Sequence, residues 1–285
     1  MTQLQTIAHA KLNLTLDVLG KRPDGYHNLE MVMQEIDLGD TVTLRLETGK
    51  PWTVASDSGE VPSDDSNLAV KAARLFFEET GIDCGGLSVT IHKRTPVCAG
   101  MGGGSADGAA VLRMLYDHYQ RPCTEETLYR LAERVGSDVP FALFGGTALA
   151  REKGQILTRL SPMPICSIVV CKPNFPVSTP SLFRAIDGET VTRRPRTEKI
   201  IEALENGDLF SIADHLYNVF MPVVEREHPE VREIRMAMID AGARNACMTG
   251  SGPTVFGLFE RRCEAETCCE ILSRQYKDTF LTNPV

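Results

Sequence analysis

The sequence has no excess of basic residues and no long hydrophobic run. Its 285 residues include 38 acidic and 30 basic side chains, a net charge of −8, which excludes a broad basic face for duplex nucleic acid or an anionic membrane. The longest mildly apolar stretch, 139–150, contains one proline and two glycines and is too short to cross a bilayer. Polar residues interrupt the leucines near the N-terminus, so they do not form the apolar core of a signal peptide. These absences predict a cytoplasmic protein with no membrane or nucleic-acid partner and leave its oligomeric state open.

The cysteines lack the spacing of a disulfide framework or a metal site. There are nine of them, an odd number, and no two are separated by only two residues. The pairs at 166 and 171 and at 263 and 268 have no neighbouring pair of histidines. The pattern predicts small buried side chains in a reducing compartment and no metal ion held by the protein alone.

Hydrophobic periodicity predicts a mixture of strands and helices without regular alternation. Residues 11–18 alternate strictly between polar and apolar side chains, which indicates a strand with one buried face. Other strands are expected at 29–37, 41–47, 87–91, 147–152, 165–171, 245–249, 254–259 and 278–282, and helices at 67–80, 106–119, 124–135, 198–206, 208–219, 229–241 and 261–274. This mixture predicts an α+β protein of two domains, 1–155 and 156–285.

A glycine-rich loop at 96–106 is the strongest single signal. It holds Gly100, Gly102, Gly103 and Gly104 between a predicted strand and a predicted helix. Glycines let backbone N–H groups converge on an anion, and the following helix adds its positive N-terminal end. The loop matches neither GxxxxGK[ST], nor GxGxxG, nor GxSxG. We therefore expect a phosphate-binding loop of another kind rather than a flexible turn.

A second glycine cluster, 248–254, lies between two late predicted strands. By itself such a cluster is more typical of a hairpin-like turn than of a site. It gains interest only because the first glycine loop precedes it. The two interpretations stay open.

Four further stretches follow one another in the order found in a known enzyme family. They are residues 10–14 (Ala-Lys-Leu-Asn-Leu), 22–27 (Arg-Pro-Asp-Gly-Tyr-His), 136–141 (Gly-Ser-Asp-Val-Pro-Phe) and 249–253 (Thr-Gly-Ser-Gly-Pro). With the glycine loop they resemble the GHMP kinases, from about residue 8 to 259. The resemblance implies an N-terminal ATP domain like the second domain of ribosomal protein S5 and a ferredoxin-like C-terminal domain. The Asp-Gly-Tyr-His segment resembles the branch that phosphorylates a cytidine diphosphate sugar alcohol in non-mevalonate isoprenoid synthesis.

The resemblance also implies a role for individual residues. Lys11 and Asp138 would form the catalytic pair of a kinase that uses ATP and Mg²⁺. The cytosine of the acceptor would lie between Tyr26 and Phe183 and contact His27. The other implied binding residues are Asn13 and Thr179 for the acceptor, Asn67 near the adenine or ribose, and Pro96, Val97, Cys98, Ala99, Gly100, Met101, Gly102, Gly103, Gly104, Ser105 and Ala106 for the ATP phosphates.

The sequence departs from the family pattern at three places and leaves two alternatives. Cys98 stands where alanine or glycine is usual, Gly108 stands where alanine is usual, and no lysine follows Phe141 as it does in some members. Gly108 weakens the helix start by up to about 1 kcal/mol. The alternatives are a GHMP kinase for homoserine or a mevalonate derivative, and a catalytically silent nucleotide- or RNA-binding module. The arginines at 193, 194 and 196 are expected in a solvated loop rather than in a phosphate clamp.

Overall fold

The chain divides into two compact units that are interleaved along the sequence. A computed structural model describes residues 2–188 and 191–285. The first unit contains the chain up to Ala10, Leu38–Val97 and Gly102–Phe144, and the second contains Lys11–Asp37, Cys98–Met101 and Gly145–Val285. These contact units differ from the single boundary expected at 155, because two 20-residue strands and the glycine loop each contribute to both units.

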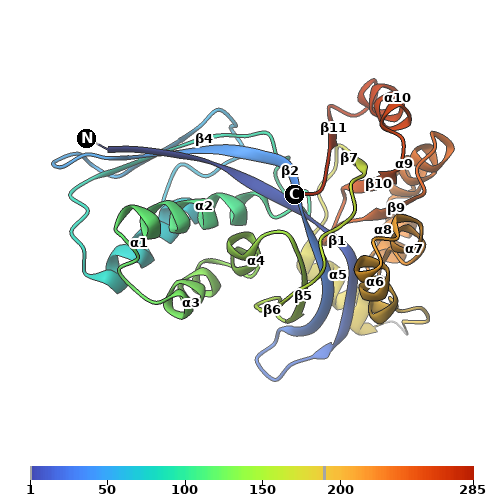
Figure 1. Ribbon diagram of the computed structural model, residues 1–285, viewed down its shortest axis with the longest axis horizontal. Helices are drawn as coiled ribbons and strands as arrows, with labels where there is room; N and C mark the ends of the chain where they lie inside the picture. The colour runs from blue at the N-terminus through green and yellow to red at the C-terminus, as the bar shows by residue number, and fades with distance from the viewer. Residues whose placement is uncertain (1, 189–190) are drawn as a thin grey trace. The chain divides into compact units, whose positions relative to one another are not determined.

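The first unit packs helices against a sheet (Figure 1). Its elements are the beginning of β1 (Thr2–Lys21), the end of β2 (His27–Leu46), β3 (Thr53–Ser56), α1 (Leu68–Thr80), β4 (Leu87–His92), α2 (Gly103–His118), α3 (Glu125–Val135) and α4 (Val139–Phe144). Strand β4 pairs antiparallel with β2, from Thr41 opposite His92 to Leu46 opposite Leu87. It also pairs in parallel with β3. The glycine loop therefore connects the end of β4, a strand of this sheet, to the start of α2.

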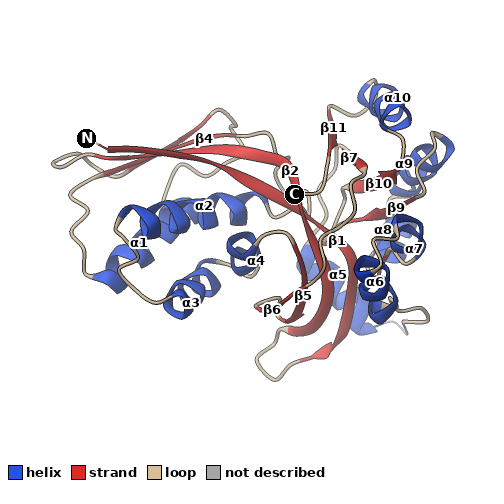
Figure 2. Ribbon diagram, in the orientation of Figure 1, coloured by secondary structure: helices blue, strands red, loops and turns tan. Residues whose placement is uncertain are grey.

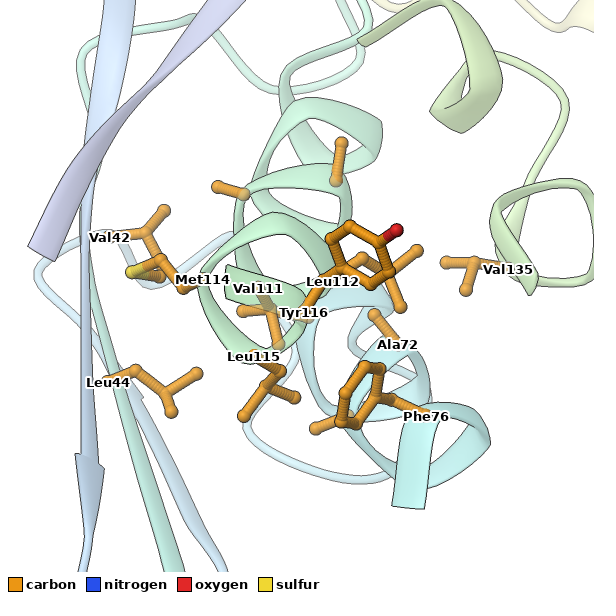
Figure 3. Packing of buried hydrophobic residues seen from close by; sticks show 14 of the residues in the cluster. Val42, Leu44, Ala72, Phe76, Val111, Leu112, Met114, Leu115, Tyr116 and Val135 are labelled. Atoms are coloured by element: carbon orange, nitrogen blue, oxygen red, sulfur yellow. The ribbon is translucent and has the colours of Figure 1, made fainter. Parts of the chain in front are cut away.

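The core of the first unit follows directly from the sequence periodicity. Val42 and Leu44 alternate on β2, while Phe76 of α1 and Leu115 of α2 recur at helical spacing, and all four are fully buried. Figure 3 shows these side chains packed together between the strands and the two helices. Burying one such side chain contributes about 1.5–3 kcal/mol. The core thus fixes α2, whose first residues belong to the predicted phosphate loop.

The second unit contains a four-stranded antiparallel sheet with helices packed on it (Figure 2). Its elements after β2 are β5 (Thr147–Glu152), β6 (Ile156–Arg159), β7 (Ser167–Lys172), α5 (Thr179–Gly188), α6 (Thr197–Glu205), α7 (Leu209–Asp214), β8 (Tyr217–Asn218), α8 (Met221–Glu227), α9 (Pro229–Asp240), β9 (Asn245–Met248), β10 (Val255–Phe259), α10 (Arg262–Ser273) and β11 (Asp278–Thr282). The strand order of this sheet is β11-β7-β10-β9. In the same unit β2 pairs with β5, and β1 pairs in parallel with β8, with Thr15 opposite Tyr217.

Several predicted elements have different bounds in the structure. Strand β1 extends well beyond 11–18, and β2 is one strand where two were expected, because the buried Asp40 interrupts its apolar pattern. The helix expected at 208–219 is wrong in its second half, where Tyr217–Asn218 form β8. The loop expected around the arginines at 193, 194 and 196 follows α5, which continues to Gly188, and residues 189 and 190 lie outside the described residues. The elements β3, β6, α4, α5 and α8 were not predicted.

Helix α1 confirms its predicted boundaries. The Asn67 side chain accepts a hydrogen bond from the N–H of Ala69 at 2.9 Å, and Gly81 ends the helix with a φ of 67°. Among the described residues, no helix has the length and apolar character needed to cross a membrane.

Candidate active site

The polar face of β1 holds a buried lysine and a buried asparagine. Lys11 is 7% exposed and Asn13 is fully buried. The Lys11 ammonium donates to Asn13 Oδ1 at 2.7 Å. The same oxygen accepts from the N–H of Gly250 at 3.0 Å and lies 3.4 Å from Thr249 Oγ1. Because one oxygen accepts from several donors, Asn13 fixes both the ammonium and the second glycine cluster.

The two glycine segments meet within the second unit. The Thr249 hydroxyl lies 3.4 Å from the Gly100 carbonyl, and the N–H of Lys11 donates to the Met101 carbonyl at 3.0 Å. Gly100 has a φ of 71°, and a Cβ there would lie 2.5 Å from the carbonyl oxygen of Thr249. A Cβ on Gly250 would likewise lie 2.5 Å from the Gly100 carbonyl oxygen. The second cluster is therefore part of the same assembly as the first loop and not merely a hairpin turn.

Asn218 is a second buried amide that holds the second glycine cluster. Its fully buried amide donates to the carbonyls of Met248 and Gly250 at 2.9 and 2.8 Å. Its Oδ1 accepts from the N–H of Phe220 at 3.0 Å. Asn218 was not predicted as a functional residue, because the sequence pattern favoured a helix at 208–219. The available signal was one polar residue in the apolar run 216–220, since a buried amide needs partners.

A tight turn presents Tyr26. The N–H of Arg22 donates to the Tyr26 carbonyl at 2.7 Å, and Asp24 Oδ1 accepts from the Tyr26 N–H at 3.1 Å. Gly25 has a φ of 85°, a conformation that favours glycine. The Tyr26 side chain is exposed and the Lys153 ammonium lies 5.3 Å from its ring centre. The turn leaves one face of an aromatic ring accessible for a planar ligand.

His27 and Phe183 form a stacked pair beside this turn. Their ring centres are 4.5 Å apart and their planes are inclined by 17°. His27 Nε2 lies 2.8 Å from Asp187 Oδ1, and Lys21 lies 3.5 Å from the other oxygen of Asp187. The hydrogen bond with His27 is the main reason why the pKa of Asp187 is lowered. Among the described residues, Tyr26 and Phe183 form no ring pair with each other, so a cytosine between them remains a prediction.

Helix α5 carries three of these side chains on one face. Thr179, Phe183 and Asp187 are four residues apart, the spacing of neighbours on one side of a helix. Thr179 Oγ1 donates to Ser251 Oγ at 2.7 Å, which connects the helix to the second glycine cluster. The structure thus brings Thr179, Phe183 and His27 into one unit with Lys11 and Asn13. Asp187 was not predicted as a site residue.

The first unit contains Asp138 and Asn67. Asp138 directly precedes α4, where its carbonyl accepts from the N–H of Ala142 at 3.1 Å and the residue is half-buried. Asn67 uses its side chain to begin α1 and to donate to the Pro62 carbonyl at 2.9 Å. Its role near the adenine or ribose remains a prediction.

The helical end of the glycine loop also lies in the first unit. Gly102, with a φ of 70°, precedes α2, and no side chain in the described part of the chain caps this helix start. Helix α2 begins at Gly103, three residues before the expected 106, because the glycines themselves form its first turn. The N–H groups of this turn lack intrahelical acceptors and can bind an anion. This end of α2 is therefore suited to a phosphate group.

Comparison with known proteins assigns the chain to a family. Residues 67–146 match the GHMP kinases N-terminal domain, and residues 200–278 match the GHMP kinases C-terminal domain. A 4-diphosphocytidyl-2-C-methyl-D-erythritol kinase from Alkaliphilus metalliredigens is 40% identical over 281 residues, which cover 99% of this chain and 96% of that protein. The chain belongs to the GHMP kinases. A kinase of the same name from Pelotomaculum thermopropionicum is 44% identical over 255 residues, 90% of this chain and 88% of that protein.

Solved structures support the GHMP kinase fold. A crystal structure of 4-(cytidine 5′-diphospho)-2C-methyl-D-erythritol kinase has a TM-score of 0.83 and 33% identity and covers 99% of each chain. A mevalonate kinase from L. major has a TM-score of 0.76 at 17% identity, covers 99% of this chain and 96% of its own, and shares the fold. The expected two-domain fold of a GHMP kinase, with mixed α and β structure, is confirmed. The predicted enzyme class, a small-molecule kinase, is also confirmed. GHMP kinases use ATP. Membership in this family argues against a catalytically silent binding module.

The arginine-rich loop of this GHMP kinase is more ordered than the sequence indicated. Arg194 donates to Asp17 Oδ1 at 2.6 Å and to the Val18 carbonyl at 2.9 Å. Arg193 stacks on the Tyr217 ring, with its guanidinium carbon 4.6 Å from the ring centre. These contacts attach the loop to β1 and β8, where it lines a pocket of about 560 Å³. Interpretation as a purely solvated loop is therefore incomplete.

Proposed function

We propose that this GHMP kinase transfers the γ-phosphoryl group of ATP to the 2-hydroxyl of 4-diphosphocytidyl-2-C-methyl-D-erythritol in non-mevalonate isoprenoid synthesis. The products are the 2-phosphate of this acceptor and ADP. The observation that carries the proposal is the 40% identity, over 99% of the chain, with a kinase named for this acceptor. The Asp24–His27 segment supports the same branch of the family.

Lys11 and Asp138 are proposed as the catalytic residues. In the transfer, the acceptor oxygen forms a bond to the γ-phosphorus, the bond from that phosphorus to the bridging oxygen breaks, and ADP leaves. The acceptor hydroxyl proton passes to the Asp138 carboxylate, and the Lys11 ammonium offsets the negative charge on the transferred group. Because Asn13 holds this ammonium, Lys11 is already oriented before substrates bind. A loose transition state demands little of a base, so positioning supplies much of the rate.

The ATP phosphates are proposed to bind the loop from Pro96 to Ala106. A protein with a net charge of −8 needs local groups that attract a polyanion. The start of α2, whose first N–H groups lack intrahelical acceptors, and the Lys11 ammonium are such groups. The Asn67 region is proposed to contact the adenine or ribose.

Mg²⁺ is proposed to arrive with ATP. Across residues 2–188 and 191–285, no three or more histidine, cysteine, aspartate or glutamate side chains form a group that could hold a metal ion. Mg²⁺ in phosphotransferases is usually held by substrate phosphates with one or two carboxylates, so the residues present fit this arrangement rather than a protein-built cage. When bound, the ion would neutralise part of the phosphate charge.

The acceptor is proposed to bind along α5 and the Tyr26 turn. Asn13 and Thr179 would contact its polar groups, while Tyr26, His27 and Phe183 would recognise the cytosine. The stacked His27 and Phe183 rings and the exposed Tyr26 ring support an aromatic site for a planar base.

A coupled ADP-release assay tests this proposal. The protein is supplied with ATP, Mg²⁺ and the diphosphocytidyl acceptor, with homoserine and mevalonate in parallel reactions. We expect ADP release only with the cytidine acceptor. Equal release without an acceptor, or selective release with homoserine or mevalonate, would contradict the proposal.

The catalytic assignment is tested by Lys11→Ala and Asp138→Ala. Each is expected to lower kcat by at least about 10²-fold, the usual loss for a positioned charge or proton acceptor. Lys199→Ala is the control, because Lys199 is exposed in a surface ion pair with Glu202. Circular dichroism checks folding. Folded variants with undiminished kcat would remove these two residues from the catalytic site.

A further inference from the structure

Three ionisable side chains are buried together beside the start of α2. Asp40 is fully buried, Asp107 is 2% exposed and the Lys93 side chain is 7% exposed. The Lys93 ammonium forms ion pairs with the carboxylates of Asp40 and Asp107, the second at 3.0 Å. We call these three residues the lysine cluster.

The lysine cluster joins three segments of the first unit. Asp40 lies on β2, Lys93 directly follows β4, and Asp107 lies in the second turn of α2. Asp40 Oδ1 also accepts from the N–H groups of Arg94 and Thr95 at 2.6 and 2.8 Å. The cluster therefore fixes the backbone that leads from the sheet into the glycine loop and links it to the helix at the other end of that loop.

The Lys93 ammonium lies against the first residue of α2. A Cβ built on Gly103 would be 3.3 Å from Lys93 Nζ and 2.9 Å from Thr95 Cγ2. The ammonium and the threonine methyl thus support the turn whose N–H groups are free to bind phosphate. A displacement of this support would move those N–H groups directly.

Fold stability alone does not account for the lysine cluster. Buried charges lose their hydration, and replacing such a group with apolar residues of similar volume is often neutral or stabilising. In the described part of the chain, Asp107 Oδ1 and Thr95 Oγ1 are buried without a hydrogen-bond partner. Unsatisfied polar atoms of this kind are costly and are retained where a binding site needs a fixed geometry.

We propose that Lys93, Asp40 and Asp107 are positioning residues that fix the N-terminal turn of α2 for binding of the ATP phosphates. The proposal rests on the proposed ATP site and is independent of the acceptor's identity. The three side chains act through the backbone of the loop and of α2. They set nucleotide affinity while leaving the acceptor site of the second unit unchanged.

The test measures nucleotide binding directly, by calorimetry with the non-hydrolysable analogue AMP-PNP and Mg²⁺. Lys93→Met and Asp107→Asn are each expected to raise its Kd, and the KM for ATP, by about tenfold or more, because small displacements of a binding geometry have effects of this size. The KM for the acceptor should stay at its wild-type value, because the proposed acceptor residues belong to the second unit. Arg74→Met is the matched control, since Arg74 forms an exposed ion pair with Asp65 in the same unit.

A triple variant separates positioning from stabilisation. Lys93→Met with Asp107→Leu removes two buried charges, and Asp40→Asn removes the third while its Oδ1 can still accept from the N–H groups of Arg94 and Thr95. Because no unpaired buried charge is left, this variant is expected to recover the melting temperature even where a single variant fails to fold. Positioning predicts that its Kd for AMP-PNP stays raised. Wild-type Kd in the triple variant, or an equal rise in the KM of ATP and of the acceptor, would overturn the proposal. A wild-type protein that binds AMP-PNP without phosphorylating the acceptor would contradict the proposed function alone.

Discussion

The two halves of the glycine loop are held in different ways. Residues 98–101 belong to the second unit, where Gly100 meets the backbone of the second glycine cluster at distances that leave no room for a Cβ. Residues 102–106 belong to the first unit, where the lysine cluster supports the start of α2 through side chains. A close contact between two backbones requires glycine, so the sequence alone can indicate it. Support by buried ion pairs uses charged residues that look like surface residues in the sequence, so the sequence alone does not predict it.

The largest effect is expected from a methyl group in the first of these halves. In Gly100→Ala the alanine must adopt the left-handed backbone conformation with a φ of 71°, and its Cβ would lie 2.5 Å from the Thr249 carbonyl oxygen. We expect a loss of about 3 kcal/mol or more in the free energy of unfolding, measured by urea denaturation. Gly104→Ala is the control, because the nearest atom to its Cβ would be Leu68 Cδ1 at 3.9 Å. Equal stability of the two variants would show that close backbone contact does not hold residues 98–101.

Most of what was predicted correctly depends on local sequence. Asn67 and Gly81 end α1 by interactions within one turn, and the alternation of residues 11–18 places Lys11 and Asn13 on one face of β1. The glycine loop and the start of α2 are also contiguous in sequence. These features need no knowledge of the rest of the fold, so periodicity and residue type predict them.

The features that escaped prediction depend on distant partners. Asn218 holds residues 30 and 32 positions away, Asp187 contacts a histidine 160 positions away, and Lys93 pairs with Asp40 across 53 positions. No local pattern encodes such pairs. Asp40 is also the reason why β2 was predicted as two strands, because a charged residue within an apolar pattern is typical of a turn. The roles assigned to Asp138 and Asn67 came from resemblance and stay predictions.

The second-largest effect concerns pH and the charged support of α2. Burial raises the pKa of Asp107 from 3.8 to about 7, with Lys93 opposing and Asp40 adding to this rise. A folded-state pKa above the unfolded value means that the stabilisation is complete below about pH 4 and is lost as the pH rises through about 7. We expect the free energy of unfolding to fall by up to about 1.4 kcal/mol per pH unit within this window. Urea denaturation of wild type and Asp107→Asn from pH 5 to pH 8 should show a smaller fall in the variant.

Asp57 provides the control for this pH dependence. It is exposed, and a hydrogen bond from the Lys93 backbone N–H is the main reason why its pKa is lowered. Its contribution is present above the unfolded pKa and is lost only at lower pH, so Asp57→Asn should keep the wild-type slope between pH 5 and pH 8. An unchanged slope in Asp107→Asn would show that the charged support does not titrate as described.

The third effect separates the acceptor site from both halves of the loop. Phe183→Ala removes the ring stacked on His27, and Tyr26→Ala removes an exposed ring. Each is expected to raise the KM for the cytidine acceptor by an amount equivalent to about 1–3 kcal/mol of lost stacking, with the KM for ATP unchanged. Phe210→Ala, which removes another exposed aromatic side chain, is the control. A rise in the KM for ATP instead would contradict the cytosine site.

The smallest effect is expected at Cys98, the first residue of the half of the glycine loop that backbone contacts hold. Cys98 is exposed and has a φ of 52°, a conformation that costs a non-glycine residue about 1–2 kcal/mol. Cys98→Gly removes this cost but increases the entropy of the unfolded chain, so we expect a net gain of up to about 1 kcal/mol in urea denaturation. Cys98→Ala keeps the strained backbone and removes only the thiol, so its stability should match wild type. If Cys98→Ala stabilised the protein as much as Cys98→Gly, the thiol and not the backbone conformation would be the source of the cost. The loop would then tolerate a Cβ at position 98 as readily as at Gly104.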